Sequence, residues 1–419
     1  MPKLKDYDDG VNVIVAKVPC GGKENRDLFR LQVNLVVANL AVKSGWVTDF
    51  EDHNTRKVYV VFVGSCGAMI EIFRCDDLLM KEGEYWVYVP DLKRLKHQIL
   101  MPIGSCKIAP AYAQPGKELW RPPSQKLAYV SILHSSEAYV CGAIALAQSI
   151  VQFEKRNHPP HDLILLVDNS ITPKSIKGLK ASGWKIKKIE SISNPFAKKG
   201  SSYNEYWNYS KLRIWQLTMY DKIIFIDANV LILKNIEMFF FYPQLSASLE
   251  DHKRFNSGFM VIEPSQCMFE NLMQKMDKVQ SYNGGEQGFL NEIFTLWHRL
   301  SWKVNYLKYF EGQRMKEKHD EIPKDVYAIH YLGLKPWMCY RDYDCNWDMQ
   351  NHHIFSSDLA HKRWWRVYDK MPLKLKSYCG LTKKMDQRII QWRENARNAN
   401  LSNGHWKIEV KDSRRKNLG

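Results

Sequence analysis

The sequence predicts an α/β protein in which a mainly parallel sheet carries helices on both faces and follows a smaller N-terminal α/β domain. Its 419 residues suffice for two modest domains. Short apolar runs alternate with helical patterns over residues 126–345, and that alternation is typical of a parallel sheet. A proline-rich stretch, 109–125, separates this part from residues 1–108.

Composition indicates a folded globular chain, because 45% of the residues are hydrophobic and 25% are charged. The net charge of +16 favours an anionic partner such as a phosphate, an acidic sugar, nucleic acid or a membrane, without choosing among them. No nucleic-acid recognition motif is present, so we expect no nucleic-acid partner. The nine cysteines lack the repeated C-x-x-C spacing of a zinc module, which leaves disulfides open but not their pairing.

No apolar run approaches the roughly 20 residues that a transmembrane helix needs, and Asn34 and Asn39 interrupt the run 33–42. The first ten residues are polar and charged, so we expect neither a signal peptide nor a membrane anchor in this chain as given. The sequence does not indicate an oligomeric state.

In the N-terminal domain, residues 11–18 and 58–63 are predicted to form buried strands, and residues 28–42 a helix. We find no chemical motif there, so the role of this domain stays open. Four prolines and Gly116 lie in 109–125, a composition that resists helix and central strand and predicts a linker.

After the linker, strands are predicted at 127–134, 162–168, 185–190, 222–227 and 259–263, with helices at 139–153 and 206–220. Ligands of parallel α/β sheets bind beyond the carboxyl ends of the strands, so the residues just after each strand are candidate site residues. Residues 346–419 form an aromatic and basic extension. Its segment 383–415 is expected to form a basic amphipathic helix and a solvated end.

Asp227, Ala228 and Asn229 directly follow the strand 222–227. Side chains alternate along an extended chain, so positions 227 and 229 can face the same side and hold a hard divalent cation that bridges a diphosphate. A turn stabilised by side-chain to backbone hydrogen bonds is the alternative for this triplet alone.

His330 follows another strand pattern, 325–329, within the segment 330–337. An imidazole completes a mixed oxygen and nitrogen shell suited to manganese. Lys335 could neutralise phosphate as a point charge, and Gly333 would let the backbone approach closely. Alone, His330 would be interpreted as a structural histidine and Lys335 as a surface charge.

Two further polar segments fit a sugar site. Asn256, Ser257 and Gly258 precede a predicted strand and offer an amide and a hydroxyl to sugar hydroxyls. Residues 283–288 combine glycines with Glu286 and Gln287 at the start of a helical pattern. The alternative for the second segment is a glycine-rich turn with an acidic helix cap.

These motifs, in this order, resemble the retaining glycosyltransferases of family 8, the family of glycogenin. Within it, the N-terminal region and the segments 330–337 and 339–345 are most similar to the plant glucuronyltransferases of xylan, once called plant glycogenin-like starch initiation proteins. The resemblance implies a GT-A-type, Rossmann-like fold for residues 126–345.

The resemblance also assigns roles by position. It implies that Asp227, Asn229 and His330 hold manganese, and that Tyr139 stacks on the uracil of a UDP-sugar. The full set of residues implied in binding the UDP-sugar and its metal is Leu133, Ser135, Ser136, Tyr139, Lys211, Asp227, Ala228, Asn229, Asn256, Ser257, Gly258, Gly285, Glu286, Gln287, His330, Gly333 and Lys335.

Two positions depart from the family pattern. Asn229 stands where the family has a second Asp, which should weaken metal binding because hard cations favour charged oxygens. Glu286 stands where the family usually has Asp, which advances the carboxylate by one methylene. Misplacement on the order of 1 Å can cost roughly a hundredfold in rate, so we expect reduced or altered activity.

The expected function is transfer of glucuronate from UDP-glucuronate to the xylan backbone, with retention, Mn²⁺ dependence and a Golgi lumenal location implied by the resemblance. Glu286 and Gln287 would line the reacting face without a protein nucleophile, and Lys335 would stabilise the leaving diphosphate. Alternatives are a glycogenin-like glucosyltransferase acting on glucan or protein, and a non-catalytic glycan-binding homologue.

Two surrounding segments are candidates for contacts with the substrates. Rings in the stretch 337–365 offer flat faces for acceptor sugars, with core packing as the alternative. They are Trp337, Tyr340, Tyr343, Trp347 and Trp364. A glucuronate carboxylate needs a cationic partner, and His252, Lys253 and Arg254 are the candidates nearest in sequence to Asn256.

Overall fold

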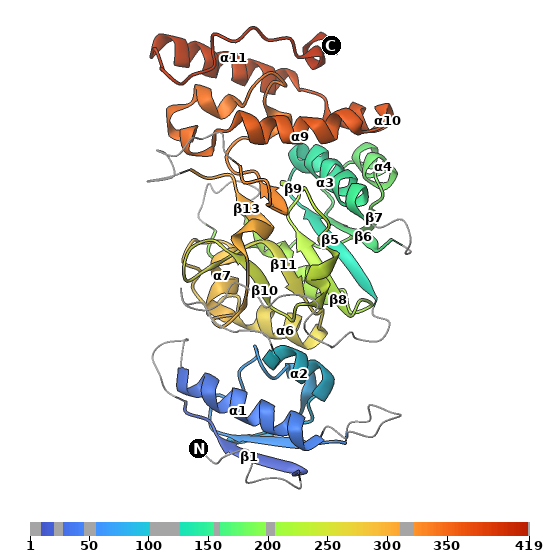
Figure 1. Cartoon of the computed structure of the whole chain (residues 1–419), viewed down its shortest axis with the longest axis vertical. Coiled ribbons are helices and arrows are strands. Elements are labelled where there is room, and N and C mark those ends of the chain that lie inside the picture. Colours follow the sequence, from blue (N-terminus) through green and yellow to red (C-terminus); the bar gives the residue numbers. More distant parts are fainter. Residues whose placement is uncertain are drawn as a thin grey trace.

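The computed structural model describes residues 10–20, 28–45, 56–100, 126–154, 160–197, 206–310 and 322–417. An N-terminal unit (residues 10–100), a central unit (126–345) and a C-terminal extension (346–417) follow one another along the long axis (Figure 1). The predicted linker 109–125 lies outside the described residues. In the described part of the chain, no helix is both long and apolar enough to cross a membrane.

The N-terminal unit is a four-stranded sheet in the order β1-β2-β4-β3. Its strands are β1 (Val13–Lys17), β2 (Tyr59–Val63), β3 (Leu78–Glu82) and β4 (Tyr85–Tyr88), and its helices are α1 (Leu28–Gly45), η2 (Cys75–Asp77) and α2 (Leu92–Leu100). The predicted helix and strands are present. The prediction that these strands are buried is wrong for alternate residues such as Val13 and Val15, because α1 and its neighbours cover one face only.

The central unit contains a seven-stranded sheet in the order β12-β10-β11-β8-β5-β6-β7. Its strands are β5 (Leu127–Leu133), β6 (Asp162–Val167), β7 (Lys185–Lys188), β8 (Lys222–Ile226), β10 (Ser246–Leu249), β11 (Phe255–Ile262) and β12 (His298–Leu300). Strands β8, β5, β6 and β7 pair in parallel, and β11 runs antiparallel to β8 and β10. The predicted mainly parallel sheet is confirmed.

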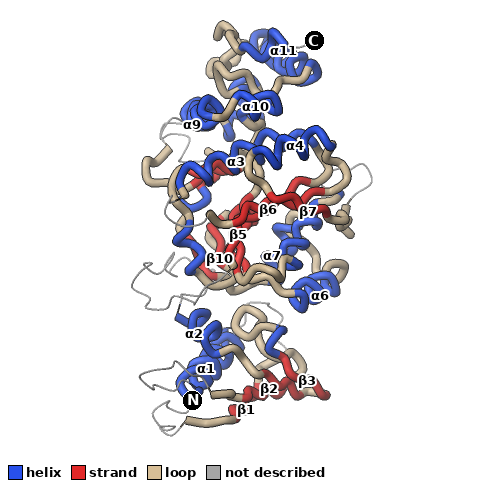
Figure 2. Tube along the Cα trace, turned by 90° about the vertical axis from the view of Figure 1, so that its right-hand side faces the viewer, coloured by secondary structure: helices blue, strands red, loops and turns tan. Residues whose placement is uncertain are grey.

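Alternating side chains of β5 enter two different cores. Tyr129 packs with α3 (Val140–Phe153) and α4 (Pro173–Ala181) on one face. Val130 packs with η4 (Asn208–Gln216), α6 (Gln266–Lys275) and α7 (Glu286–Ile293) on the other. Figure 2 shows strands between these helix layers. A strand apolar on both faces therefore becomes the centre of the GT-A-type fold.

Two local predictions differ from the structure. The helix expected at 206–220 is the 3-10 helix η4, and the strand expected from residue 259 begins at Phe255. Asn256, Ser257 and Gly258 therefore lie inside β11 rather than in a loop, because pairing of Phe255 with Leu249 of β10 extends the strand backwards.

A second, three-stranded sheet brings distant parts of the sequence together in the order β13-β14-β9. It consists of β9 (Val230–Ile232), β13 (Tyr306–Leu307) and β14 (Ala328–His330). His330 pairs with Val230 in this sheet, so it lies next to the segment that follows β8. Short 3-10 helices connect these elements: η3 (Glu137–Tyr139), η5 (Glu237–Phe241), η6 (Trp302–Asn305), η7 (Pro336–Met338), η8 (Cys345–Asp348) and η9 (Gln350–Phe355).

The C-terminal extension contains α9 (Asp358–Lys370), α10 (Leu373–Lys376), η10 (Ser377–Cys379), α11 (Lys383–Asn398) and η11 (Ser413–Asn417). The predicted basic helix is present as α11, and most described residues after it are exposed or half-buried, as predicted, with Asp412 and Arg414 as buried exceptions. Arg414 is buried, pairs with Asp412 at 2.7 Å and donates to the carbonyls of Trp337, Cys339 and Cys379.

The aromatic rings expected to meet acceptor sugars are also buried in the protein core. Trp337, Tyr340, Tyr343, Trp347 and Trp364 are each at most 8% exposed. The expectation of an open aromatic platform there is wrong, since these rings pack against one another and against α9 and α11.

Four disulfides join the described cysteines: Cys20–Cys66, Cys75–Cys267, Cys141–Cys379 and Cys339–Cys345. Cys75–Cys267 links the N-terminal unit to α6, and Cys141–Cys379 links α3 to η10. Both appended units are thus covalently fixed to the central unit. Cys106 lies outside the described residues.

Replacing Arg414 by Met should lower the free energy of unfolding by about 3–5 kcal/mol, because buried Asp412 and three backbone carbonyls lose their cation. The adjacent Arg415→Met is the control. Its side chain is 41% exposed and pairs with Asp386, so the loss there should stay below about 1 kcal/mol. Chemical denaturation of both variants measures the difference, and equal losses would contradict the role given to Arg414.

Candidate active site

A cavity of about 270 Å³ lies at the carboxyl ends of β5 and β8, where the sheet topology predicts a ligand. Seven predicted site residues line it: Leu133, Tyr139, Lys211, Asp227, Ala228, Asn229 and Glu286. Its other lining residues, which the sequence analysis missed, are Ile132, His134 and Asn208.

Lys211 of η4 is the centre of the cavity's polar floor. Its ammonium lies 2.7 Å from Glu286 Oε1 and 3.1 Å from Asp227 Oδ1, and it donates to Ser257 Oγ at 3.1 Å. The side chain is only 7% exposed, so these three acceptors replace its water shell. Lys211 thereby connects η4, the end of β8, β11 and α7.

Burial alone would lower the pKa of Lys211, but the charges of Asp227 and Glu286 outweigh it and raise the pKa above its usual value. Glu286 is also buried, yet Lys211 keeps the pKa of this carboxyl below its usual value. Burial raises the pKa of Asp227 in spite of Lys211. The two carboxylates thus share one ammonium unequally, and the closer Glu286 gains more from it.

Asn229 and the segment after β14 are held together by reciprocal hydrogen bonds. Tyr331 N–H donates to the Asn229 carbonyl at 2.9 Å, and Asn229 Nδ2 donates to the Tyr331 carbonyl at 3.1 Å. Lys335 Nζ donates to the same Tyr331 carbonyl at 2.7 Å. Since its amide nitrogen is engaged, Asn229 has its oxygen left as a possible ligand.

His330 packs against the backbone of β11 at a position that only glycine permits. A Cβ atom on Gly258 would lie 2.4 Å from Cε1 and 2.7 Å from Nδ1 of His330. Burial, with Lys335 and Lys211 nearby, lowers the pKa of His330 to about 3, so the imidazole is neutral. Its Nδ1 is buried against Gly258 without a hydrogen-bond partner, and His330 is not among the residues that line the cavity.

Asp227, Asn229 and His330 offer a carboxylate oxygen, an amide oxygen and an imidazole nitrogen, a donor set that fits manganese. The described residues contain no group of three His, Cys, Asp or Glu side chains placed to hold a metal. The candidate trio differs from such a group because its second member is an amide.

The residues matched to the donor-sugar loops form one hydrogen-bonded cluster. Gln287 Oε1 accepts from Ser257 N–H at 3.0 Å, and Gln287 Nε2 donates to Glu250 at 2.7 Å. Asn256 Oδ1 accepts from Gly258 N–H and Asn305, so this side chain stabilises the local backbone. Gly285 caps α7 close to Asn208. Gln287 does not line the cavity, whereas its neighbour Glu286 does.

The loop after β5 is shaped by Asp168, which the sequence analysis did not select. Asp168 accepts from Ser135 N–H at 3.0 Å and Ser191 Oγ at 3.0 Å. Ser135 has a positive φ of 69°, and Ser136 caps η3 by accepting from Ala138 N–H. Neither serine lines the cavity. They lie just before Tyr139, which lines the cavity and whose ring packs edge-to-face against Trp337.

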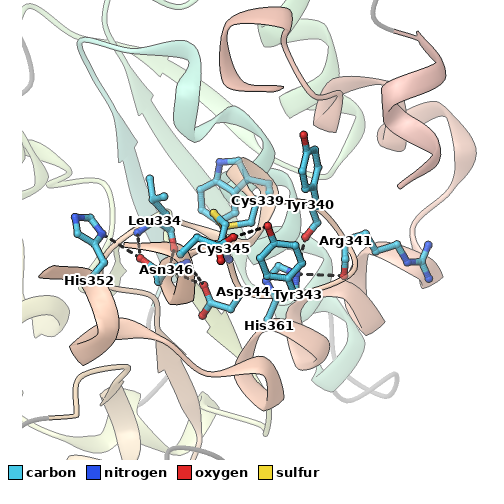
Figure 3. Close-up of a disulfide and its surroundings, with 12 residues drawn as sticks. Leu334, Cys339, Tyr340, Arg341, Tyr343, Asp344, Cys345, Asn346, His352 and His361 are labelled. Carbon is cyan, nitrogen blue, oxygen red and sulfur yellow. Dashed lines mark hydrogen bonds between the residues drawn. A yellow bond between two sulfur atoms is a disulfide. The ribbon is translucent and has the colours of Figure 1, made fainter. Parts of the chain in front are cut away.

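Neither Lys335 nor Gly333 is among the residues that line the cavity. Asn346 receives a hydrogen bond from Leu334 N–H at 2.9 Å and donates to the Leu334 carbonyl at 3.0 Å, beside the Cys339–Cys345 disulfide (Figure 3). Gly333 has a φ of 69°, and a Cβ there would lie 2.6 Å from Asn346 Oδ1. Burial, with Lys308 nearby, lowers the pKa of Lys335 to about 7.

The three candidate partners for a uronate carboxylate differ in position. His252 and Lys253 are exposed at the turn between β10 and β11. Arg254 stacks over the ring of Tyr282 at 4.1 Å, and Tyr282 and Gln287 both donate to Glu250. Arg254 is therefore the one of the three that the structure connects to Gln287.

Family profiles and individual relatives both match this chain. Residues 1–106 match the profile "GUX1-5 N-terminal domain", and residues 131–339 match "Glycosyl transferase family 8". "Putative UDP-glucuronate:xylan alpha-glucuronosyltransferase 4" of Arabidopsis thaliana is 55% identical, covering 100% of this chain and 76% of that protein. "UDP-glucuronate:xylan alpha-glucuronosyltransferase 2" of the same plant is 48% identical, covering 99% and 71%.

Among solved structures, the galactosyltransferase LgtC with donor and acceptor sugar analogues is 14% identical, with a TM-score of 0.40, over 60% of this chain and 99% of that one. Its likeness concerns the fold alone. With whole-chain relatives at about half identity, the chain belongs to glycosyltransferase family 8.

Proposed function

We propose that this protein transfers glucuronate from UDP-glucuronate to the xylan backbone, with retention at the anomeric carbon. The proposal is supported by the whole-chain similarity to relatives with that name. The observation that carries it is the cavity at the strand ends, where Tyr139 lies at one side and the buried Lys211–Asp227–Glu286 cluster at the floor. An apolar ring beside a polar, charged floor suits a nucleotide joined to a sugar through a diphosphate.

In this proposal Tyr139 offers its ring to the uracil, and Asp227, Asn229 and His330 would hold a divalent cation. A bound Mn²⁺ would supply Lewis-acid stabilisation of the leaving diphosphate. Lys335 would add positive charge from behind this group. Glu286, with Gln287 next to it, would lie at the reacting face and position the donor sugar for attack by a xylan hydroxyl on the face that the diphosphate leaves.

We further propose that the protein works in an oxidising lumen, that of the Golgi, in the synthesis of cell-wall hemicellulose. Four disulfides support this compartment, because such bonds persist in the secretory pathway and are rare in the cytosol.

The donor can be tested directly. Purified protein incubated with xylo-oligosaccharides and UDP-glucuronate should add a hexuronate mass, and with UDP-glucose it should add little or no hexose. The reason is that Arg254, which is 42% exposed and pairs with Asp251 at 3.3 Å, would in this proposal pair with the uronate carboxylate and so favour the charged sugar. Mass spectrometry reads both products. Hexose addition without uronate addition would point to a glucosyltransferase, and glycan binding without any turnover to a non-catalytic homologue.

Metal dependence is tested by calorimetry of UDP binding with and without Mn²⁺. Mn²⁺ should strengthen UDP binding, and His330→Ala should remove that gain by deleting one ligand. Gly258→Ala should do the same, because its Cβ would displace the His330 ring. Gly380→Ala is the matched control, since a Cβ there meets nothing within 4 Å. Equal UDP affinity with and without Mn²⁺ in a folded protein argues against this site.

Donor selectivity tests the carboxylate partner. Arg254→Gln should lower kcat/KM for UDP-glucuronate roughly 10- to 100-fold, the worth of a charged hydrogen bond, while leaving slow use of UDP-glucose unchanged. Lys253→Gln, one residue away and exposed, is the control. An equal loss with both donors would mean that Arg254 merely supports Tyr282 and the local fold.

A further inference from the structure

The sheet of the N-terminal unit has one covered and one open apolar face. Even-numbered residues such as Ile14, Val60 and Phe62 are buried in the core that α1 completes. Odd-numbered residues on the same strands point the other way. Large apolar side chains on this face are between 38% and 66% exposed: Val13, Val15, Tyr59 and Tyr85, together with Met80, which a register shift in β3 pairs with Val87.

This open face forms one end of the molecule. Figure 1 shows α1 and α2 between the sheet and the central unit, so the face is turned away from the central unit. Exposed apolar patches of a few hundred Å² are often functional, which makes this face a candidate interaction site.

Strand register places the charges of this face at its two edges. Lys17 of β1 pairs with Val63, Val63 with Tyr85, and Tyr85 with Glu82 of β3. One row across the sheet therefore begins with a cation and ends with an anion. The preceding row is apolar throughout, since it contains Val15, Val61, Val87 and Met80.

We propose that this face binds a second copy of the chain, sheet against sheet, about a twofold axis parallel to the strands. That rotation places β1 of one copy over β3 of the other, so Lys17 faces the partner subunit's Glu82 and the reverse pair forms as well. The row of Val15, Val61, Val87 and Met80 in one copy then packs against the same row in the other copy. A twofold axis perpendicular to the strands would instead set both charges against apolar side chains, which disfavours it.

The distances and the size of the face are consistent with a weak, reversible dimer. Packed sheets lie about 10 Å apart, a gap that a lysine and a glutamate side chain can span together. Four strands of about five residues cover roughly 300 Å² of flat area, less than the roughly 800 Å² per partner of a standard stable interface. Because the N-terminal unit makes this contact, the candidate active site in the central unit of each copy stays uncovered.

Sedimentation of the whole chain over a concentration series tests the proposal. The wild type should shift from monomer to dimer as concentration rises, and Val15→Asp should abolish the shift. Lys17→Glu and Glu82→Lys should each raise the dissociation constant at least about tenfold, because each places like charges opposite one another twice per dimer. The double variant Lys17→Glu with Glu82→Lys should return to within about threefold of wild type, since the pairs are restored with reversed sign.

The control is Lys43→Glu, the same charge change on α1, which covers the opposite face of the sheet. It should leave the dissociation constant unchanged. A wild type that stays monomeric at every concentration, or a dimer insensitive to Val15→Asp, overturns the proposal. Single reversals that the double variant does not rescue overturn the twofold pairing. Far-ultraviolet circular dichroism of each variant shows that it is folded.

Discussion

Burial of the Lys211 ammonium is the constraint on which the site depends. An ammonium removed from water is tolerated only when acceptors surround it, and here they come from three other elements. Asp227 directly follows β8, Ser257 belongs to β11 and Glu286 is the first residue of α7. Since loss of any carboxylate would leave buried charge uncompensated, these elements are locked to one another in the absence of donor. The floor of the cavity is therefore preorganised.

The charges of the residues at this floor also restrict which ligands the cavity can bind. Among the described lining residues, Asp227 and Glu286 carry two negative charges and Lys211 one positive charge, while burial lowers the pKa of His134 and favours its neutral form. A net negative floor repels a bare diphosphate. In the proposed function, a divalent cation held by Asp227, Asn229 and His330 would offset that repulsion and attract phosphate. The charges of the floor are therefore compatible with the proposed cation.

Sequence patterns predicted the parts of this arrangement that depend on local chemistry. Alternating apolar runs predicted the sheet, and the polar residues after β8 were candidates because strand ends of a parallel sheet meet at one edge. Leu133, Tyr139 and Lys211 were selected only through the resemblance to the family. Contacts between distant segments were not predictable in this way. Asp168 resembles any strand-end aspartate until Ser135 and Ser191 are seen around it. Rings such as Trp337 carry no local sign of whether they face solvent or core, and nine cysteines admit many pairings.

Asn229 shows why a departure from a family pattern cannot be judged by ligand chemistry alone. An aspartate at this position would supply a better metal oxygen, but it would lose the donation to the Tyr331 carbonyl and set a carboxylate oxygen against it. That carbonyl also receives Lys335, so one backbone oxygen connects a candidate ligand to a candidate diphosphate lysine. Glu286 is similar, since its longer side chain reaches Lys211 at 2.7 Å. Both side chains are therefore integrated into the hydrogen bonding of the site.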